Sequence, residues 1–188
     1  IIKGPVLVIS PLIALMIDQV RQLKRQGIKA MYFESHSKSL PIQQQIDNCI
    51  HGNYNLVYSS PERFLNSYFI HQLTQANFSL ITIDEAHCIS EWGHDFRPEY
   101  RKIRPIIKQI ADVHIIALTA TATPKVQVDI QKNLEMVEAN VFKSSFNRDN
   151  LFYEVRPKKD ALKQIVQYAL NNKGKSGIVY CLSRKKVE

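Results

Sequence analysis

A run of apolar residues passes directly into two acidic ones at Leu80-Ile81-Thr82-Ile83-Asp84-Glu85-Ala86-His87. Its first four residues are uncharged and rich in β-branched side chains, which is typical of a buried strand. In parallel α/β sheets, ligands bind outside the carboxyl ends of the strands. The run therefore predicts a strand at residues 80–83 and places Asp84 and Glu85 where a ligand would bind.

Further short apolar runs occur on both sides of this strand, and helical patterns separate them. The apolar runs are continuous rather than alternating, which is typical of a parallel sheet covered by helices on both faces. We therefore expect an α/β fold built on a parallel sheet. Its strands are expected at residues 6–9, 30–33, 56–58, 80–83 and 115–118, and its helices near 12–27, 42–50 and 100–110 and from Pro124 onward.

A polar stretch at residues 143–150 separates this pattern from a second one. We place a domain boundary near Ser145, with residues 1–145 forming a partial first lobe and residues 146–188 the start of a second α/β lobe. The second lobe is expected to have strands at residues 151–155 and 177–181. Between them lies a helix with apolar positions at Leu162, Ile165, Val166 and Leu170.

The composition indicates a globular protein, since 45% of the 188 residues are hydrophobic. Cys49, Cys88 and Cys181 lie too far apart for a metal-binding pair or a disulfide framework, so we expect three buried thiols in a reducing compartment. No apolar run approaches the roughly 18 residues of a membrane span, and the first residues lack the pattern of a secretion signal. A soluble chain of the cytoplasm, or of the nucleus in a eukaryote, is expected.

The formal net charge of +8 favours a polyanionic partner. Lysine and arginine side chains that bind phosphates release counterions, and this release helps to drive binding. Charge alone does not identify nucleic acid as the partner, because many basic proteins never bind it.

The acids after the strand at residues 80–83 suit the chemistry of a nucleotide. Asp84 can hold Mg²⁺ through the water shell of the ion, because Mg²⁺ keeps several waters and takes only one or two carboxylates. Glu85 can orient or deprotonate an attacking water, and His87 can sense the γ-phosphate. The alternative is that the two acids merely cap the helix that follows.

The next segment carries the most specific resemblance. Cys88-Ile89-Ser90-Glu91-Trp92-Gly93-His94-Asp95-Phe96-Arg97-Pro98-Glu99-Tyr100-Arg101 resembles the aromatic-rich loop of RecQ helicases, a family of DEAH proteins. We call residues 88–101 the aromatic loop. Trp92 and Phe96 offer faces on which DNA bases can stack, Arg97 can pair with phosphate or stack, and His94 lies between them. The alternative is ordinary core packing of the two rings.

Five other segments resemble motifs of the same family, in the same order along the chain. The resemblance implies that Ser10 lies where the DNA backbone is bound and that Thr119 and Thr121 link the nucleotide site to DNA. Helix capping by Ser10 and a plain Ser/Thr turn are the alternatives. The segments are motif Ia (residues 10–20), motif Ib (59–64), motif III (118–123), the segment joining the lobes (145–151) and the approach to motif IV (174–181).

The sequence departs from the family pattern at three positions. Asn147 and Asp149 stand where the joining segment usually has Asp and Pro, and Ile17 stands where motif Ia commonly has Lys. These differences affect the expected interlobe geometry and phosphate contact rather than the family resemblance.

The 188 residues contain no G-x-x-x-x-G-K-[ST] loop for nucleotide phosphates. Gly174-Lys175-Ser176 has the right ending, but Ala169 occupies the position of the first glycine and the triplet precedes an expected strand, so we interpret it as a surface turn. The resemblance implies a phosphate loop before Ile1 and an arginine finger beyond Glu188, with zinc-binding and winged-helix modules further on. The piece alone is therefore expected to be inactive.

The resemblance implies a RecA-like motor that uses ATP and Mg²⁺ to translocate 3′ to 5′ and to unwind duplex DNA. Its expected partners are single-stranded and duplex DNA, with no membrane, and the motor is expected to be monomeric. A competing hypothesis is a non-hydrolysing module that binds single-stranded DNA. An RNA-directed DEAH protein is disfavoured by the aromatic loop.

Overall fold

The computed structural model describes residues 4–34, 40–52, 54–144 and 149–183. The chain divides into two compact units, Ile1–Val141 and Phe142–Glu188. The boundary that we expected near Ser145 falls on a residue outside the described ones.

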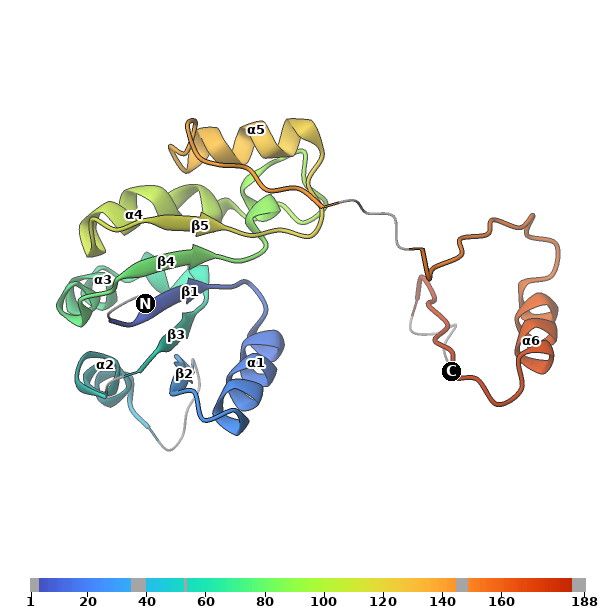
Figure 1. The fold of residues 1–188 in the computed structure, drawn as a ribbon, viewed down its shortest axis with the longest axis horizontal. Coiled ribbons are helices and arrows are strands. Elements are labelled where there is room, and N and C mark those ends of the chain that lie inside the picture. The colour runs from blue at the N-terminus through green and yellow to red at the C-terminus, as the bar shows by residue number, and fades with distance from the viewer. Residues whose placement is uncertain (1–3, 35–39, 53, 145–148, 184–188) are drawn as a thin grey trace. The chain divides into compact units, whose positions relative to one another are not determined.

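The first unit is built on a five-stranded sheet (Figure 1). Its strands lie in the order β2-β3-β1-β4-β5, and every neighbouring pair is parallel. The expected parallel α/β fold is therefore confirmed, and β4, which precedes Asp84, lies inside the sheet between β1 and β5. The strands are β1 (Val6–Ile9), β2 (Ala30–Tyr32), β3 (Leu56–Ser59), β4 (Leu80–Ile83) and β5 (Ile115–Ala117).

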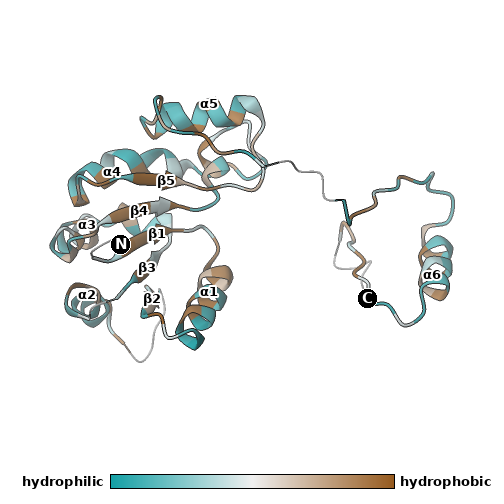
Figure 2. Ribbon diagram, in the orientation of Figure 1, coloured by the Kyte–Doolittle hydropathy of each residue, from teal (hydrophilic) through white to brown (hydrophobic). Residues whose placement is uncertain are grey.

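Helices cover both faces of the sheet, as the continuous apolar strands predicted. Leu7 and Ile83 pack with residues of α2, α3, α4 and α5 in one core cluster, whereas Val8 and Tyr58 pack on α1 in another. Figure 2 shows hydrophobic residues along the strands and a mixture of hydrophobic and hydrophilic residues on the helices. The helices are α1 (Ile13–Arg25), α2 (Ile42–His51), α3 (Ser67–Leu73), α4 (Ile103–Ile110) and α5 (Pro124–Asn133).

Short 3-10 helices lie in the connections between strands and helices; one of them contains His87, and another contains the end of the aromatic loop. They are η1 (Pro61–Leu65), η2 (Thr74–Ala76), η3 (Ala86–Ile89) and η4 (Pro98–Lys102). The helix that we expected near residues 100–110 is formed by η4 and α4 together. The helix expected from Pro124 is confirmed as α5, where the Thr123 side chain accepts a hydrogen bond from the Val126 N–H at 3.4 Å.

The second unit contains one helix, α6 (Ala161–Asn171), among its described residues, and none of the α6 side chains is buried. The strands that we expected at residues 151–155 and 177–181 are absent, so that prediction was wrong. A strand is stable only when its backbone N–H and C=O groups pair with a neighbouring strand. Without a paired sheet, the apolar runs stay irregular, and side chains such as Val155 and Leu182 are exposed.

Two further expectations concern the cysteines and the membrane. Cys49 and Cys88 are buried as expected, but Cys181 is exposed because the strand predicted for it does not form. Within the described residues, no helix is both long enough and apolar enough to cross a membrane.

Candidate functional site

Adjacent parallel strands bring Ser10 and Asp84 together, although 74 residues separate them in the sequence. Ile9 of β1 pairs with Ile83 of β4, so the residues that follow both strands emerge at the same edge of the sheet. The Ser10 hydroxyl donates a 3.1 Å hydrogen bond to Asp84 Oδ2, and the Asp84 N–H donates to the Ile9 carbonyl at 2.9 Å. These contacts fix the direction in which the Asp84 carboxylate points.

Ser10 does not cap the helix that follows it, which was one alternative for this residue. Leu12 precedes α1, and no side chain makes a capping hydrogen bond there. Ser10 is also fully buried. Its side chain binds Asp84, and the role of Ser10 in binding the DNA backbone stays a prediction.

The turn after β4 has an unusual backbone. Glu85 adopts φ 48° and ψ 43°, in the left-handed region that residues other than glycine rarely occupy. Two contacts hold the turn: the buried Tyr100 hydroxyl donates to the Asp84 carbonyl at 2.9 Å, and the Ala86 N–H donates to the Leu118 carbonyl at 2.9 Å. Such conformations persist only where the surroundings impose them, and they gather at functional sites.

The interpretation of the two acids as a simple helix cap is not supported. Asp84 Oδ1 accepts only the N–H of the next residue, at 2.9 Å, and the Glu85 side chain makes no capping hydrogen bond to η3. The Glu85 carboxylate instead approaches His87, with Oε2 3.2 Å from Nδ1.

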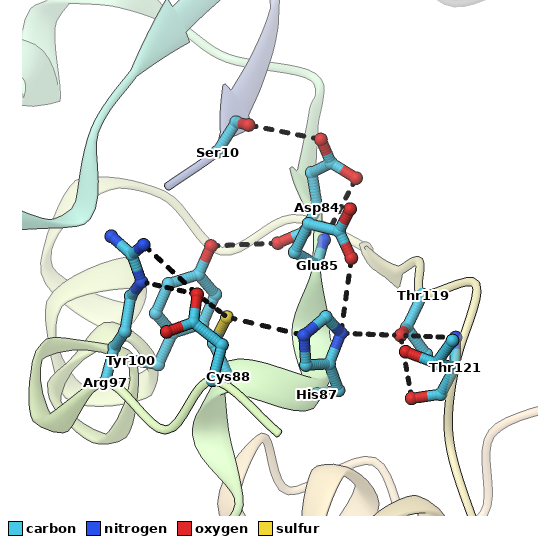
Figure 3. A network of polar contacts seen from close by, with 10 residues as sticks. Ser10, Asp84, Glu85, His87, Cys88, Arg97, Tyr100, Thr119 and Thr121 are labelled. Atoms are coloured by element: carbon cyan, nitrogen blue, oxygen red, sulfur yellow. Dashed lines mark hydrogen bonds and ion pairs between the residues drawn. The ribbon is translucent and has the colours of Figure 1, made fainter. Parts of the chain in front are cut away.

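His87 connects the acids to the segment after β5 (Figure 3). Its ring is buried, and Nδ1 lies 2.9 Å from Thr119 Oγ1 as well as close to Glu85. Thr119 Oγ1 in turn accepts a hydrogen bond of 3.3 Å from the Thr121 N–H. A side chain that follows β4 thus contacts the turn that follows the neighbouring strand, as the parallel order predicted.

Burial lowers the pKa of His87, and the charge of a protonated His94 lowers it further, while the Glu85 carboxylate opposes both effects. The His94 ring stacks on the His87 ring, with centroids 4.1 Å apart. A neutral imidazole carries one N–H, so Nδ1 can donate to Glu85 or to Thr119 but does not form two full hydrogen bonds at once. His87 is therefore placed to exchange one partner for the other.

The aromatic loop lies against this turn with its tryptophan at the surface. Trp92 is 63% exposed, so core packing of this ring, the alternative that we considered, is wrong. Phe96 is half-buried, with the Arg101 guanidinium 5.1 Å from its ring centroid. A Cβ atom on Gly93 would lie 2.5 Å from the His87 carbonyl oxygen, so only glycine permits this close approach.

Arg97 has protein partners on several sides. Its Nε and Nη2 atoms both lie 3.1 Å from Asp95 Oδ2, Nη1 donates to the Pro11 carbonyl at 3.3 Å, and Glu62 lies 3.8 Å away. Arg97 therefore ties the aromatic loop to the two segments that resemble motifs Ia and Ib. A phosphate would have to compete with Asp95 for the guanidinium.

The acids fit a metal ion that is held largely by water and substrate. Asp84 and Glu85 project from one turn, and an ionised carboxylate has about four lone-pair sites, of which Asp84 uses two. No cluster of three or more His, Cys, Asp or Glu side chains suited to a metal occurs in the described part of the chain. One or two carboxylates without a protein cage are typical of Mg²⁺ bound together with phosphates.

Sequence reasoning linked Thr119 and Thr121 to the nucleotide site at Asp84, Glu85 and His87, and the structure brings these residues together. It did not find Tyr100 or Asp95. A buried tyrosine hydroxyl needs a partner, which was an available signal for Tyr100, but its partner is a backbone carbonyl that no side-chain pattern reveals. In the sequence, Asp95 is only one residue of the aromatic loop, and its role becomes visible through its contact with Arg97.

Comparisons with known proteins agree with the resemblance seen in the sequence. The family model for the DEAD/DEAH box helicase matches residues 2–130. The chain is 45% identical to the ATP-dependent DNA helicase RecQ of Haemophilus influenzae, over 98% of this chain and 30% of that protein. It is 42% identical to the ATP-dependent helicase SGS1 of Saccharomyces cerevisiae, over 98% of this chain and 13% of that protein.

Among solved structures, the fold is similar to the Hef helicase domain of Pyrococcus furiosus. The TM-score is 0.50 at 20% sequence identity, and the match covers 70% of this chain and 27% of the other. This likeness concerns the fold alone. The chain spans about 30% of the length of the bacterial relatives that it matches.

Proposed function

The chain belongs to the DEAD/DEAH box helicase family, and on this premise we propose that it forms the central part of an ATP-driven motor that unwinds duplex DNA. The observation that carries the proposal is the contact of His87 with both Glu85 and Thr119. This contact joins a pair of acids suited to nucleotide hydrolysis to a segment that resembles the family's coupling motif. The relatives named as RecQ helicases support DNA as the substrate.

In the proposed reaction, the two acids have different tasks. Glu85 orients and deprotonates the water that attacks the γ-phosphate, and its left-handed backbone sets the direction in which its side chain leaves the turn. Asp84, held by Ser10, would hold Mg²⁺ through water, and the ion would neutralise charge on the phosphates. Orientation is the main contribution of the protein, because phosphoryl transfer depends on positioning and electrostatics.

His87 would couple the nucleotide state to DNA. While Glu85 is engaged with water, the single N–H of a neutral His87 is free to bond Thr119, and after product release it can return to Glu85. Thr119 holds the backbone of Thr121, so a change in the His87 bond reaches the turn before α5. The exchange would convert a local change in hydrogen bonding into movement of a DNA-facing segment.

DNA would bind through the aromatic loop. Trp92 is exposed, and stacking of a base on an aromatic ring is worth about 1–3 kcal/mol. The positive net charge would add affinity that weakens with salt. We propose translocation 3′ to 5′ along single-stranded DNA by a monomeric motor, located in the cytoplasm or, in a eukaryote, the nucleus.

The test uses the longer protein that contains this chain and a Glu85→Gln variant. The variant should bind single-stranded DNA normally but lose DNA-stimulated ATP hydrolysis and unwinding. Glu138→Gln, at an exposed position outside the site, serves as the matched control and should keep both activities. Normal ATP turnover in Glu85→Gln would overturn the assignment of the catalytic residue.

A second candidate function is that of a non-hydrolysing module for single-stranded DNA. It is favoured by one observation, the lack of a G-x-x-x-x-G-K-[ST] loop in these 188 residues. The coding sequence upstream of the Ile1 codon discriminates between the two. A phosphate loop in the same reading frame would support the motor, and an uninterrupted gene start without one would support the module.

A further inference from the structure

Helix α5 contacts the aromatic loop through two side chains on one of its faces. Lys125 and Asp129 are four residues apart and therefore neighbours on the helix surface. Asp129 Oδ2 accepts a hydrogen bond of 2.6 Å from the Ser90 hydroxyl, and Lys125 Nζ lies 3.0 Å from the centroid of the Trp92 ring. The Ser90 oxygen also accepts from the Trp92 N–H at 3.2 Å.

From these contacts we infer that Lys125, Asp129 and Ser90 are positioning residues that hold Trp92 as a preformed platform for one DNA base. The inference deepens the proposed function, and its DNA-binding part rests on that function. The three side chains fix both the backbone and the ring of Trp92 to α5.

The hydrogen bond between Ser90 and Asp129 holds the backbone of the aromatic loop against α5. Ser90 is fully buried and Asp129 is half-buried, so water cannot easily replace either partner. Leaving one of two buried polar groups unsatisfied is costly, which makes the pair a strong constraint on the loop. Because Ser90 also binds the Trp92 N–H, the constraint extends directly to the tryptophan.

The Lys125 ammonium orients the ring. A cation over an aromatic face is attracted to it, and here the cation covers one face of Trp92. The ring nevertheless remains 63% exposed, so surface is left for a base. A ring that is already held loses little conformational freedom on stacking, and this lowers the entropic cost of binding.

The hydrogen bond between Ser90 and Asp129 also joins the loop to the segment that contacts His87. Helix α5 begins at Pro124, three residues after Thr121, and its Val126 and Ile130 side chains lie in the core. On the other side of the loop, Gly93 packs on the His87 carbonyl. Trp92 therefore lies in the chain between Ser90, which contacts α5, and Gly93, which packs on His87. Helix α5 and His87 both belong to the proposed route of coupling.

The first measurement needs no DNA, because Trp92 is the single tryptophan of the chain. Its emission and its quenching by acrylamide report directly on the loop. We expect Lys125→Met, Ser90→Ala and Asp129→Ala to increase the quenching constant and to shift the emission. Asp129→Asn, which retains an acceptor, should keep the values of the parent chain. Lys132→Gln removes the same charge from an exposed position of α5 and should change neither.

The second measurement is the affinity for an end-labelled oligothymidylate, followed by fluorescence anisotropy. Relative to Lys132→Gln, Lys125→Met should bind about two- to fivefold more weakly, the effect of losing an exposed cation–π contact. Asp129→Ala should weaken binding as well, and Asp129→Asn should bind as the parent chain does. Trp92→Ala measures the full contribution of the platform.

The outcomes separate the inference from the proposed function. If quenching is the same in the parent chain, Lys125→Met and Ser90→Ala, the residues do not position Trp92 and the inference is wrong. If quenching responds but Trp92→Ala leaves DNA affinity unchanged, the positioning stands and the proposed DNA-binding role of the loop fails. Circular dichroism checks folding, and should Asp129→Ala not fold, Lys125→Met and Ser90→Ala decide the result.

Discussion

Replacing Tyr100 with phenylalanine tests how the turn at Glu85 is held. The substitution keeps the fully buried ring and removes only the hydroxyl, which donates a 2.9 Å hydrogen bond to the Asp84 carbonyl. Leaving one partner of a buried hydrogen bond without the other costs about 1–3 kcal/mol. We expect the free energy of unfolding to fall by that amount, and the melting temperature to fall by about 2–4 °C for each kcal/mol.

The substitution should also affect Asp84 and Glu85, the proposed catalytic acids. The left-handed backbone of Glu85 has a conformational cost of about 1–3 kcal/mol that the surrounding contacts must offset. With the Tyr100 bond removed, Glu85 is free to relax toward an ordinary conformation, and its carboxylate moves away from His87. In the longer protein, Tyr100→Phe should therefore lower the rate of DNA-stimulated ATP hydrolysis more than it lowers DNA affinity.

The assay for stability is urea unfolding of the chain, followed by circular dichroism and by the fluorescence of Trp92. Tyr68→Phe is the matched control, because the Tyr68 hydroxyl also donates a hydrogen bond, to the Gln43 side chain, but at an exposed position, so the effect of its loss should stay within about 0.5 kcal/mol. Equal stabilities of the Tyr100→Phe and Tyr68→Phe variants would refute the reasoning that the hydroxyl holds the turn.

Three further predictions concern hydrolysis, DNA binding and pH. The chain alone should not hydrolyse ATP with Mg²⁺ and DNA present, since it lacks the loop that binds the phosphates; turnover that disappears in a Glu85→Gln variant would contradict this. It should bind single-stranded DNA weakly and in a salt-sensitive manner, and a Trp92→Ala, Phe96→Ala double variant in a folded sample should bind markedly less. Because burial lowers the pKa of His87, the unfolded chain takes up this proton more readily, and the contribution of His87 to stability is present above pH ~6.5 and is lost as the pH falls toward its folded pKa. The urea midpoints measured above and below that pH should therefore lie closer together in His87→Gln than in the parent chain. The exposed control His71→Gln should keep the difference of the parent chain.

The first unit could be predicted in most respects because its signals are local. A strand that is buried on both faces is continuously apolar, and a helix repeats its apolar positions every three or four residues. Helix α3 was missed although Asn66 caps it by accepting from the Phe69 N–H at 3.1 Å, since a cap before a short helix is a weak signal. The strands expected in the second unit do not form, because a strand depends on a neighbouring strand, which a local sequence pattern does not reveal.

The sequence alone was enough to predict the order of the strands and of every helix except α3 in the first unit, and the position of Asp84 and Glu85 at the end of a buried strand. Which distant side chains complete the site depends on how the strands and helices pack in three dimensions. The Ser10 bond to Asp84, the Thr119 contact of His87 and the Lys125 contact of Trp92 join segments far apart in the chain. A local pattern records what a residue needs, burial or a hydrogen-bond partner, but the partner itself is selected by how strands pair and helices pack in three dimensions.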